Sequence, residues 1–167
     1  MTIAEVLLLD FDAEIENTRR VLERIPEDKP DWRPHEKSMR CGRLAVHTAR
    51  LPEFATKILT TDELNMATEK FPDFVFEGRK GLLSKLEESS NAARQALASA
   101  SDEYLMKNWK LLFGGKTFVD APRALLYRTM FLNHLVHHRA QLGIYLRLNE
   151  VPVPGLYGPS ADEQFAA

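Results

Sequence analysis

Most histidines of this chain lie in one segment, and that segment constrains both fold and function. Three of the five histidines fall between residues 134 and 138, in the middle of residues 120–149, DAPRALLYRTMFLNHLVHHRAQLGIYLRLN. Residues 123–141 contain no glycine or proline and are rich in residues that favour a helix. Asp120 is a suitable N-cap, and Pro122 suits the first turn. The sequence therefore predicts one long helix here.

Two of these histidines share one face of the predicted helix. At about 100° per residue, His134 and His138 lie about 40° apart, in a mostly apolar sector that should face the core. Two imidazoles at i and i+4 on an inward face have the spacing with which a helix presents two ligands to one metal ion. The alternative is a pair of hydrogen-bonded core histidines, and this helix alone favours neither. The fourth-helix stripe, a second apolar face, comprises Leu126, Met130, His137, Ile144 and Leu148.

A third histidine lies on the apolar face of another predicted helix, residues 38–60, for which Ser38 is the expected N-cap. With His47 as the origin of the helical wheel, Cys41 falls about 120° away and is not counted as a ligand. Pro52 predicts a kink near His47. Four apolar residues fall within about 60° of His47 on the same wheel: Leu44, Leu51, Phe54 and Ile58.

The proline-rich residues 26–37 are expected to form an ordered loop before this helix. Trp32 is interpreted as an anchor on the helices, with a substrate contact as the less favoured alternative. His35 is interpreted as exposed. Arg40 either holds a negatively charged ligand at the mouth of a cavity or pairs with a carboxylate at the helix end.

The remaining elements complete a fold class. Residues 2–25 and 76–100 are also predicted helices, and Thr2 with Glu5 has the spacing of a capping box. Glycines 114 and 115, between two β-prone runs, predict a hairpin. We therefore expect an all-α four-helix bundle with long crossover connections and a small β-hairpin before the last helix. The second and fourth helices should be neighbours, because they carry all the inward histidines.

Composition excludes several classes of partner. The chain has 167 residues, and residues 1–167 are predicted to form one domain. A net charge of −2 without a basic cluster argues against nucleic acid. No apolar run is long enough for a membrane span, and the acidic N-terminus does not read as a signal peptide. Cys41 is the only cysteine, which excludes an internal disulfide and fits a reducing cytoplasm.

The order and spacing of several motifs resemble the DinB superfamily, which includes the YfiT-like metal-dependent proteins. The resemblance covers about residues 5–163 and implies a four-helix bundle with a divalent metal ion on His47, His134 and His138. At two other positions, His137 is not usually a ligand in similar sequences, and Ala140 replaces a common glycine. The motifs are the Trp32-Arg33-Pro34 loop leading into Ser38-Met39, His47, the run NHLVHHRAQL at residues 133–142, and Tyr157-Gly158-Pro159-Ser160 in the tail.

The resemblance also implies a class of chemistry, because some relatives are transferases or isomerases that depend on thiols such as bacillithiol or mycothiol. We expect a metal-dependent enzyme that acts on a small molecule, in which zinc, nickel or iron activates a water or a low-molecular-weight thiol for hydrolysis or transfer. The alternative is a non-catalytic dimeric bundle that binds a metal or a small ligand. No catalytic acid or base can be named from the sequence.

Two further expectations concern the surroundings of the site. Each ligand should donate its second ring nitrogen to an acceptor, and Gln141, Asn133 and Tyr127 are the candidates. The fourth-helix stripe predicts a homodimer, because a bundle cannot bury every face of one helix. The alternative is that the first or third helix already covers this stripe.

Overall fold

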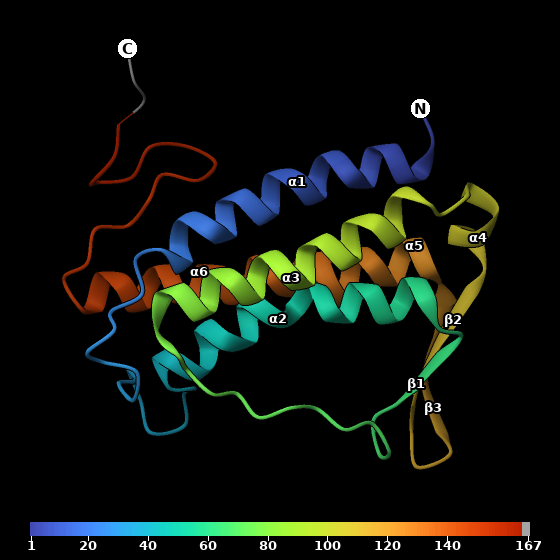
Figure 1. Ribbon diagram of the computed structural model, residues 1–167, viewed down its shortest axis with the longest axis horizontal. Coiled ribbons are helices and arrows are strands. Elements are labelled where there is room, and N and C mark those ends of the chain that lie inside the picture. Colours follow the sequence, from blue (N-terminus) through green and yellow to red (C-terminus); the bar gives the residue numbers. More distant parts are fainter. Residues whose placement is uncertain (165–167) are drawn as a thin grey trace.

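The computed structural model describes residues 1–164 and is mostly helical, with a small sheet at one end (Figure 1). The predicted mostly helical fold with a hairpin before the last helix is confirmed. α2 contacts both α3 and α6, and α1 also contacts α3 and α6, so the second and last long helices are neighbours as expected. The helices are α1 (Ile3–Leu22), α2 (Cys41–Thr60), α3 (Gly78–Ala98), α4 (Asp102–Met106), α5 (Arg123–Leu126), η1 (Tyr127–Leu132) and α6 (Asn133–Leu148).

The predicted capping box starts α1. The Thr2 hydroxyl accepts a hydrogen bond from the Glu5 N–H at 3.1 Å, and the Glu5 carboxylate accepts one from the Thr2 N–H at 2.7 Å. Two of the four backbone donors that a helix N-terminus leaves free are thereby satisfied. Leucine, phenylalanine and isoleucine side chains at helical spacing bury the inner face: Leu7, Phe11, Ile15 and Leu22.

The predicted cap of the second helix is wrong. α2 begins at Cys41 instead of after Ser38, and its N-cap residue makes no side-chain hydrogen bond. The preceding loop supplies the partners: the Cys41 N–H donates to the Trp32 carbonyl and the Gly42 N–H to the Pro30 carbonyl, both at 2.8 Å. This loop lies so close that a Cβ on Gly42 would be 3.0 Å from the Pro30 Cβ. Glycine therefore permits the contact that starts the helix.

The sheet contains the predicted hairpin and one strand that the sequence did not predict. β2 (Asn108–Phe113) pairs antiparallel with β3 (Lys116–Pro122), and the glycines at 114 and 115 take positive φ of 55° and 84° in the turn. β1 (Glu63–Asn65) pairs parallel with β2. Trp109 of β2 forms a small second core with Ile58, Leu64 and Leu126.

The last predicted helix differs at its start and in its middle. Asp120 lies in β3 opposite Lys110 and is not an N-cap, because the hairpin extends to Pro122. Helix begins at Arg123, and the six residues of η1 form π-helical turns before α6. Such turns are wider than α-turns and often occur at functional sites. The segment is therefore three consecutive helical pieces.

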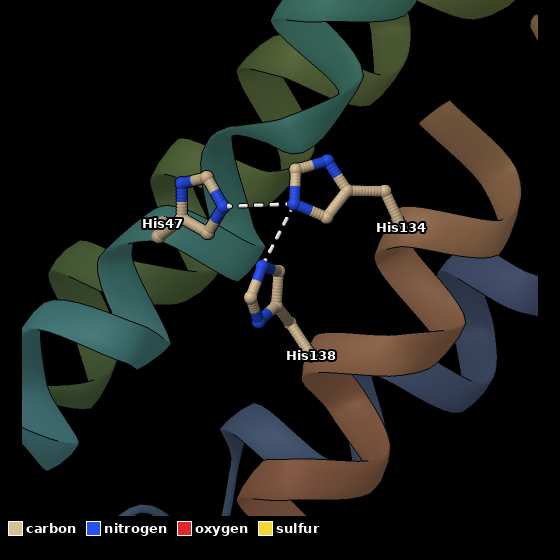
Figure 2. A group of neighbouring side chains, drawn as sticks. All are labelled: His47, His134 and His138. Atoms are coloured by element: carbon tan, nitrogen blue, oxygen red, sulfur yellow. Dashed lines mark hydrogen bonds between the residues drawn. The ribbon is translucent and has the colours of Figure 1, made fainter. Parts of the chain in front are cut away.

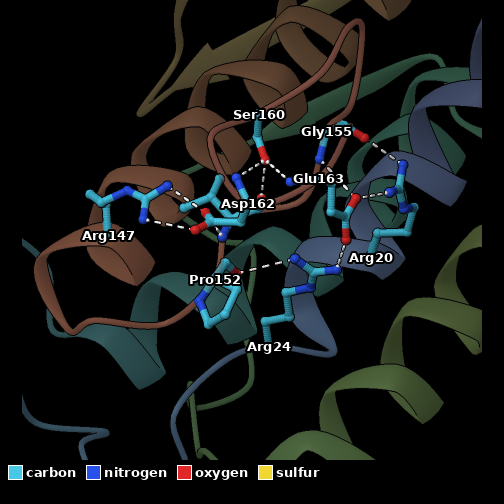
Figure 3. Close-up of polar contacts among 9 residues, drawn as sticks. Arg20, Arg24, Arg147, Pro152, Gly155, Ser160, Asp162 and Glu163 are labelled. Carbon is cyan, nitrogen blue, oxygen red and sulfur yellow. Dashed lines mark hydrogen bonds and ion pairs between the residues drawn. The ribbon is translucent and has the colours of Figure 1, made fainter. Parts of the chain in front are cut away.

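The tail after α6 folds back over α1 and α6 (Figure 3). Arg20 of α1 donates to the Glu163 carboxylate at 2.6 Å, and Arg24, which follows the end of α1, pairs with the same carboxylate. Arg147 of α6 pairs with Asp162 at 2.5 Å. α1 and α6 are thus joined to the tail through Glu163 and Asp162. Among residues 1–164, no helix is both long enough and apolar enough to cross a membrane.

Candidate metal centre

Three histidine side chains from α2 and α6 point toward one another in the interior (Figure 2). His47 Nε2 lies 3.4 Å from His134 Nε2, which lies 2.8 Å from His138 Nε2. One ligand nitrogen from each ring lies within 4.8 Å of the other two. The structure therefore brings together all three histidines that the sequence singled out, and we call them the histidine triad.

Two packed helices position the triad. His47 lies on the face of α2 that contacts α6, with buried Leu44 and Leu51 one turn to either side. His134 and His138 are one turn apart on α6, so their rings lie on the same face, with centroids 4.6 Å apart and planes tilted by 48°. The packing of α2 against α6 therefore brings the three rings together.

The spacing of the triad nitrogens fits a divalent metal ion. With metal–nitrogen distances of about 2.0–2.1 Å, two ligand nitrogens are about 3.3 Å apart at a tetrahedral angle and about 2.9 Å apart at a right angle. The observed separations of 3.4 Å and 2.8 Å match these values. They also match hydrogen bonds between neutral rings, which is the alternative that the sequence left open.

The tautomer of His138 is the one that a metal ligand needs. Its Nδ1 lies 2.7 Å from Gln141 Oε1, one of the three acceptors that the sequence proposed. An amide oxygen in this position assigns the proton to Nδ1 and leaves a lone pair on Nε2, as a metal ligand requires. Within residues 1–164, Asn133 and Tyr127 make no hydrogen bond to these rings. Gln141 is therefore the one candidate of the three that the structure places at the site.

Burial keeps the triad uncharged at neutral pH. Desolvation, with smaller contributions from His138 and His134, lowers the pKa of His47 from 6.5 to about 4. Burial also lowers the pKa of His134 and that of His138, although a hydrogen bond with Met130 or Gln141 acts in the opposite direction in each case. Neutral imidazole is the form that binds metal ions, so no proton has to be removed first.

The triad borders a large cavity. His47 and His134 contribute to the lining of a cavity of about 1060 Å³. His138 is buried, with 6% of its surface exposed, and Gln141 lies on its far ring nitrogen. The Phe74 ring lies 5.7 Å from the His47 ring and forms part of the cavity wall. A molecule in this cavity can therefore reach two of the three imidazoles.

The other polar residues singled out in the sequence lie outside the triad. His137 is exposed, and its ring contacts the edge of His138. His35 is exposed, as predicted. Arg40 pairs with Asp31 at 2.7 Å, which is the carboxylate alternative. Cys41 is buried, and burial raises the pKa of its thiol to about 11, so it stays protonated.

The residues that line the cavity opposite α2 were not predicted from the sequence. They belong to the connection between β1 and α3. Three phenylalanines within six residues, in the run FPDFVF at 71–76, were an available signal, because solvated links rarely hold so many aromatic side chains. Trp32 lies partly buried with its ring edge on Tyr145 at 5.3 Å between centroids, consistent with an anchor.

Comparison with known proteins places this site in a family context. The chain is 26% identical over 160 residues to "Uncharacterized protein YrdA" of Bacillus subtilis (strain 168), covering 93% of this chain and 89% of that protein. A crystal structure of a DinB-like protein from Bacillus cereus ATCC 10987 aligns with a TM-score of 0.68 at 19% identity, over 92% of this chain and 97% of that chain. The DinB-like protein YjoA from Bacillus subtilis aligns with a TM-score of 0.67 at 17% identity, over 94% and 97%.

These two structures establish the likeness of fold. The sequence of residues 1–164, which includes the whole histidine triad, matches the DinB family. The match was expected from the motifs around Trp32, the triad and the tail. Because it spans nearly the entire chain, the protein belongs to the DinB family.

Proposed function

We propose that α1, α2, α3 and the helical segment 123–148 form a four-helix bundle whose triad holds a divalent metal ion, and that the protein is a metal-dependent enzyme acting on a small molecule. One observation carries the proposal. Three neutral imidazoles converge at ligand spacing beside a cavity of about 1060 Å³. Three protein ligands leave at least one coordination position open, which is typical of catalytic sites and not of structural ones.

The chain's own groups have distinct tasks in this site. His47, His134 and His138 would hold the ion, and Gln141 keeps His138 in the ligand tautomer. Phe74 and the apolar lining make the surroundings of the triad on the cavity side less polar, which strengthens electrostatic interactions there. When bound, a divalent ion supplies a Lewis acid that lowers the pKa of a water or a thiol.

Thiol transfer is better supported than hydrolysis. Within residues 1–164, the potential ligand group contains histidines only and no carboxylate. A thiol bound to the ion would need no separate base, because the ion lowers its pKa. A low-molecular-weight thiol is therefore the proposed co-substrate, and zinc, nickel and iron all accept imidazole ligands. A non-catalytic binding protein is the second candidate, and the access from the cavity to His47 and His134 argues against it.

We also propose a homodimer through part of the fourth-helix stripe. Ile144 and Leu148 remain 61% and 54% exposed on α6, with exposed His137 on the same face. Leu126 does not take part, because it is buried in the second core with Trp109. The exposed part of the stripe is therefore shorter than the wheel suggested, and a dimer would use the C-terminal half of the stripe. Light scattering of the wild type and of Ile144→Asp tests this state.

The primary test is metal content. Tag-free wild type, His138→Ala and the control His137→Ala are dialysed against trace zinc, nickel and iron and then analysed for metals. We expect about one ion per chain in the wild type and in His137→Ala, and none in His138→Ala. Metal-loaded protein is then assayed for transfer of low-molecular-weight thiols to electrophiles. Substoichiometric metal in all three samples would mean that the triad serves only in core packing, and it would contradict the proposed metal-dependent enzyme.

A further inference from the structure

The cavity beside the triad extends along α2. One wall runs along α2 from Val46 to Lys57, which is about 16 Å at 1.5 Å per residue. His47 lies near one end of this wall, whereas Phe54 and Lys57 lie toward the sheet end. The opposite wall is the connection from β1 to α3, which runs alongside the helices (Figure 1). The cavity therefore leads from the triad toward the sheet.

Apolar side chains dominate its lining along this length. Phe54 of α2, Met130 of η1, and Met66, Phe71 and Phe74 of the connection all face it. Aromatic rings and methionines give large, adaptable apolar contacts. A volume of about 1060 Å³ is slightly above the usual range for small-molecule sites, about 300–1000 Å³. The cavity can hold a ligand of considerable size.

Charged groups around the cavity compensate one another. Three basic residues of the lining are paired with carboxylates: Arg50 with Glu53 at 2.7 Å, Lys57 with Glu69 at 2.9 Å, and Lys85 with Glu88 at 2.8 Å. The lining as a whole contains four basic and four acidic side chains: Arg50, Lys57, Lys70 and Lys85, with Glu53, Glu69, Asp73 and Glu77. A charged ligand would gain little from such a balanced lining and would lose its hydration.

Specific contacts hold the connection against α2. Arg50 donates to the Pro72 carbonyl at 3.1 Å, and the Lys57–Glu69 pair joins the same two segments further along. The guanidinium groups of Arg43 and Arg50 lie over the Phe74 ring at 5.4 and 5.5 Å from its centroid. These cation–π contacts keep Phe74 next to His47, so the apolar wall begins directly at the triad.

We propose that this cavity binds an uncharged, elongated, apolar molecule, with one polar group directed toward His47 and His134. The length of the α2 wall sets its body at up to about 16 Å. Its role as the electrophilic substrate rests on the proposed function, whereas its binding depends only on the cavity.

Binding of the neutral fluorescent amine 1-aminoanthracene tests the cavity. The fluorophore is titrated into wild type, Phe71→Asp and Phe118→Asp, and metal content is measured on the same samples. Phe71 lines the cavity and is 49% exposed, whereas Phe118 lies on β3 outside it and is 61% exposed, so both variants should fold. We expect one saturable site per chain, weakened about tenfold or more in Phe71→Asp and less than about twofold in Phe118→Asp.

The outcomes separate this inference from the metal site. Saturable binding that persists in metal-free His138→Ala supports the cavity even if no catalytic metal is found. Stoichiometric metal without saturable fluorophore binding would contradict the proposed apolar ligand but not the metal site. Equal weakening of fluorophore binding in both phenylalanine variants would do the same. Tighter binding of the anionic analogue anthracene-1-carboxylate than of the neutral amine would also overturn it, because the balanced charges predict the reverse order.

Discussion

Protonation of the triad couples the site to the stability of the protein. The pKa of His47 is lowered from 6.5 to about 4, and the pKa values of His134 and His138 are lowered as well. Below pH 6.5 the unfolded chain therefore binds protons at positions where the folded protein does not. The free energy of unfolding of metal-free protein is expected to fall as the pH drops from about 6.5 to about 4. Urea denaturation at a series of pH values measures this loss.

Two substitutions isolate the contribution of the triad from general acid destabilisation. His47→Gln removes one half-buried imidazole, so its free energy of unfolding should depend less steeply on pH in this window than that of the wild type. His35 is exposed, and His35→Gln should leave the slope unchanged. Equal slopes in all three proteins would show that the triad rings are protonated as readily in the folded chain as in the unfolded one.

Gln141 is the residue through which the tautomer of His138 can be changed. Its Oε1 lies 2.7 Å from His138 Nδ1, and Gln141→Leu removes that acceptor with little change in volume. Loss of such a partner typically weakens metal binding by about 10–100-fold. Competition with a chromophoric zinc chelator measures the affinity, with Gln141→Glu as the control that retains an acceptor. An unchanged affinity in Gln141→Leu would mean that Gln141 does not set the tautomer.

At the scale of single elements, the sequence predicts those features that depend on near neighbours. The capping box of Thr2 and Glu5, the i and i+4 histidines of α6 and the two-glycine turn are all local, and the structure contains each of them. A helical wheel was sufficient to place His47 on the inner face of α2, because the apolar residues of that face recur at regular helical spacing. The three histidines of the triad could therefore be identified from helical periodicity alone, whereas the cavity lining could not.

The features that the sequence did not predict depend on distant partners. β1 has only three residues, too few for a visible alternation, and exists because β2, more than forty residues later, pairs with it. The start of α2 depends on carbonyls of Pro30 and Trp32. In η1, π-turns contain more residues than α-turns, so a wheel with a constant 100° step misplaces Met130, which lines the cavity together with His134.

At the scale of the whole molecule, one buried arginine joins the triad helix to α1 and to the tail. Arg139, adjacent to His138 in α6, is 1% exposed and pairs with the carboxylate of Glu14 in α1. It also donates to the Glu14 carbonyl at 2.9 Å and to the hydroxyl of Tyr157 in the tail. A buried guanidinium is tolerated only with such compensation. The position of α6, and hence of the triad, therefore depends on a contact on its opposite side.

Removing the carboxylate should expose this dependence. Glu14→Ala leaves the Arg139 charge buried without its counterion, and the expected loss is about 3 kcal/mol in the free energy of unfolding. Glu16→Ala, on the same helix, is the matched control, because Glu16 is 64% exposed and its contact with Arg19 is 3.8 Å long. An exposed pair of this kind contributes less than about 1 kcal/mol. Chemical denaturation of both variants compares the two losses, and similar values would show that Arg139 finds sufficient compensation in Tyr157, Thr18 and the Glu14 carbonyl.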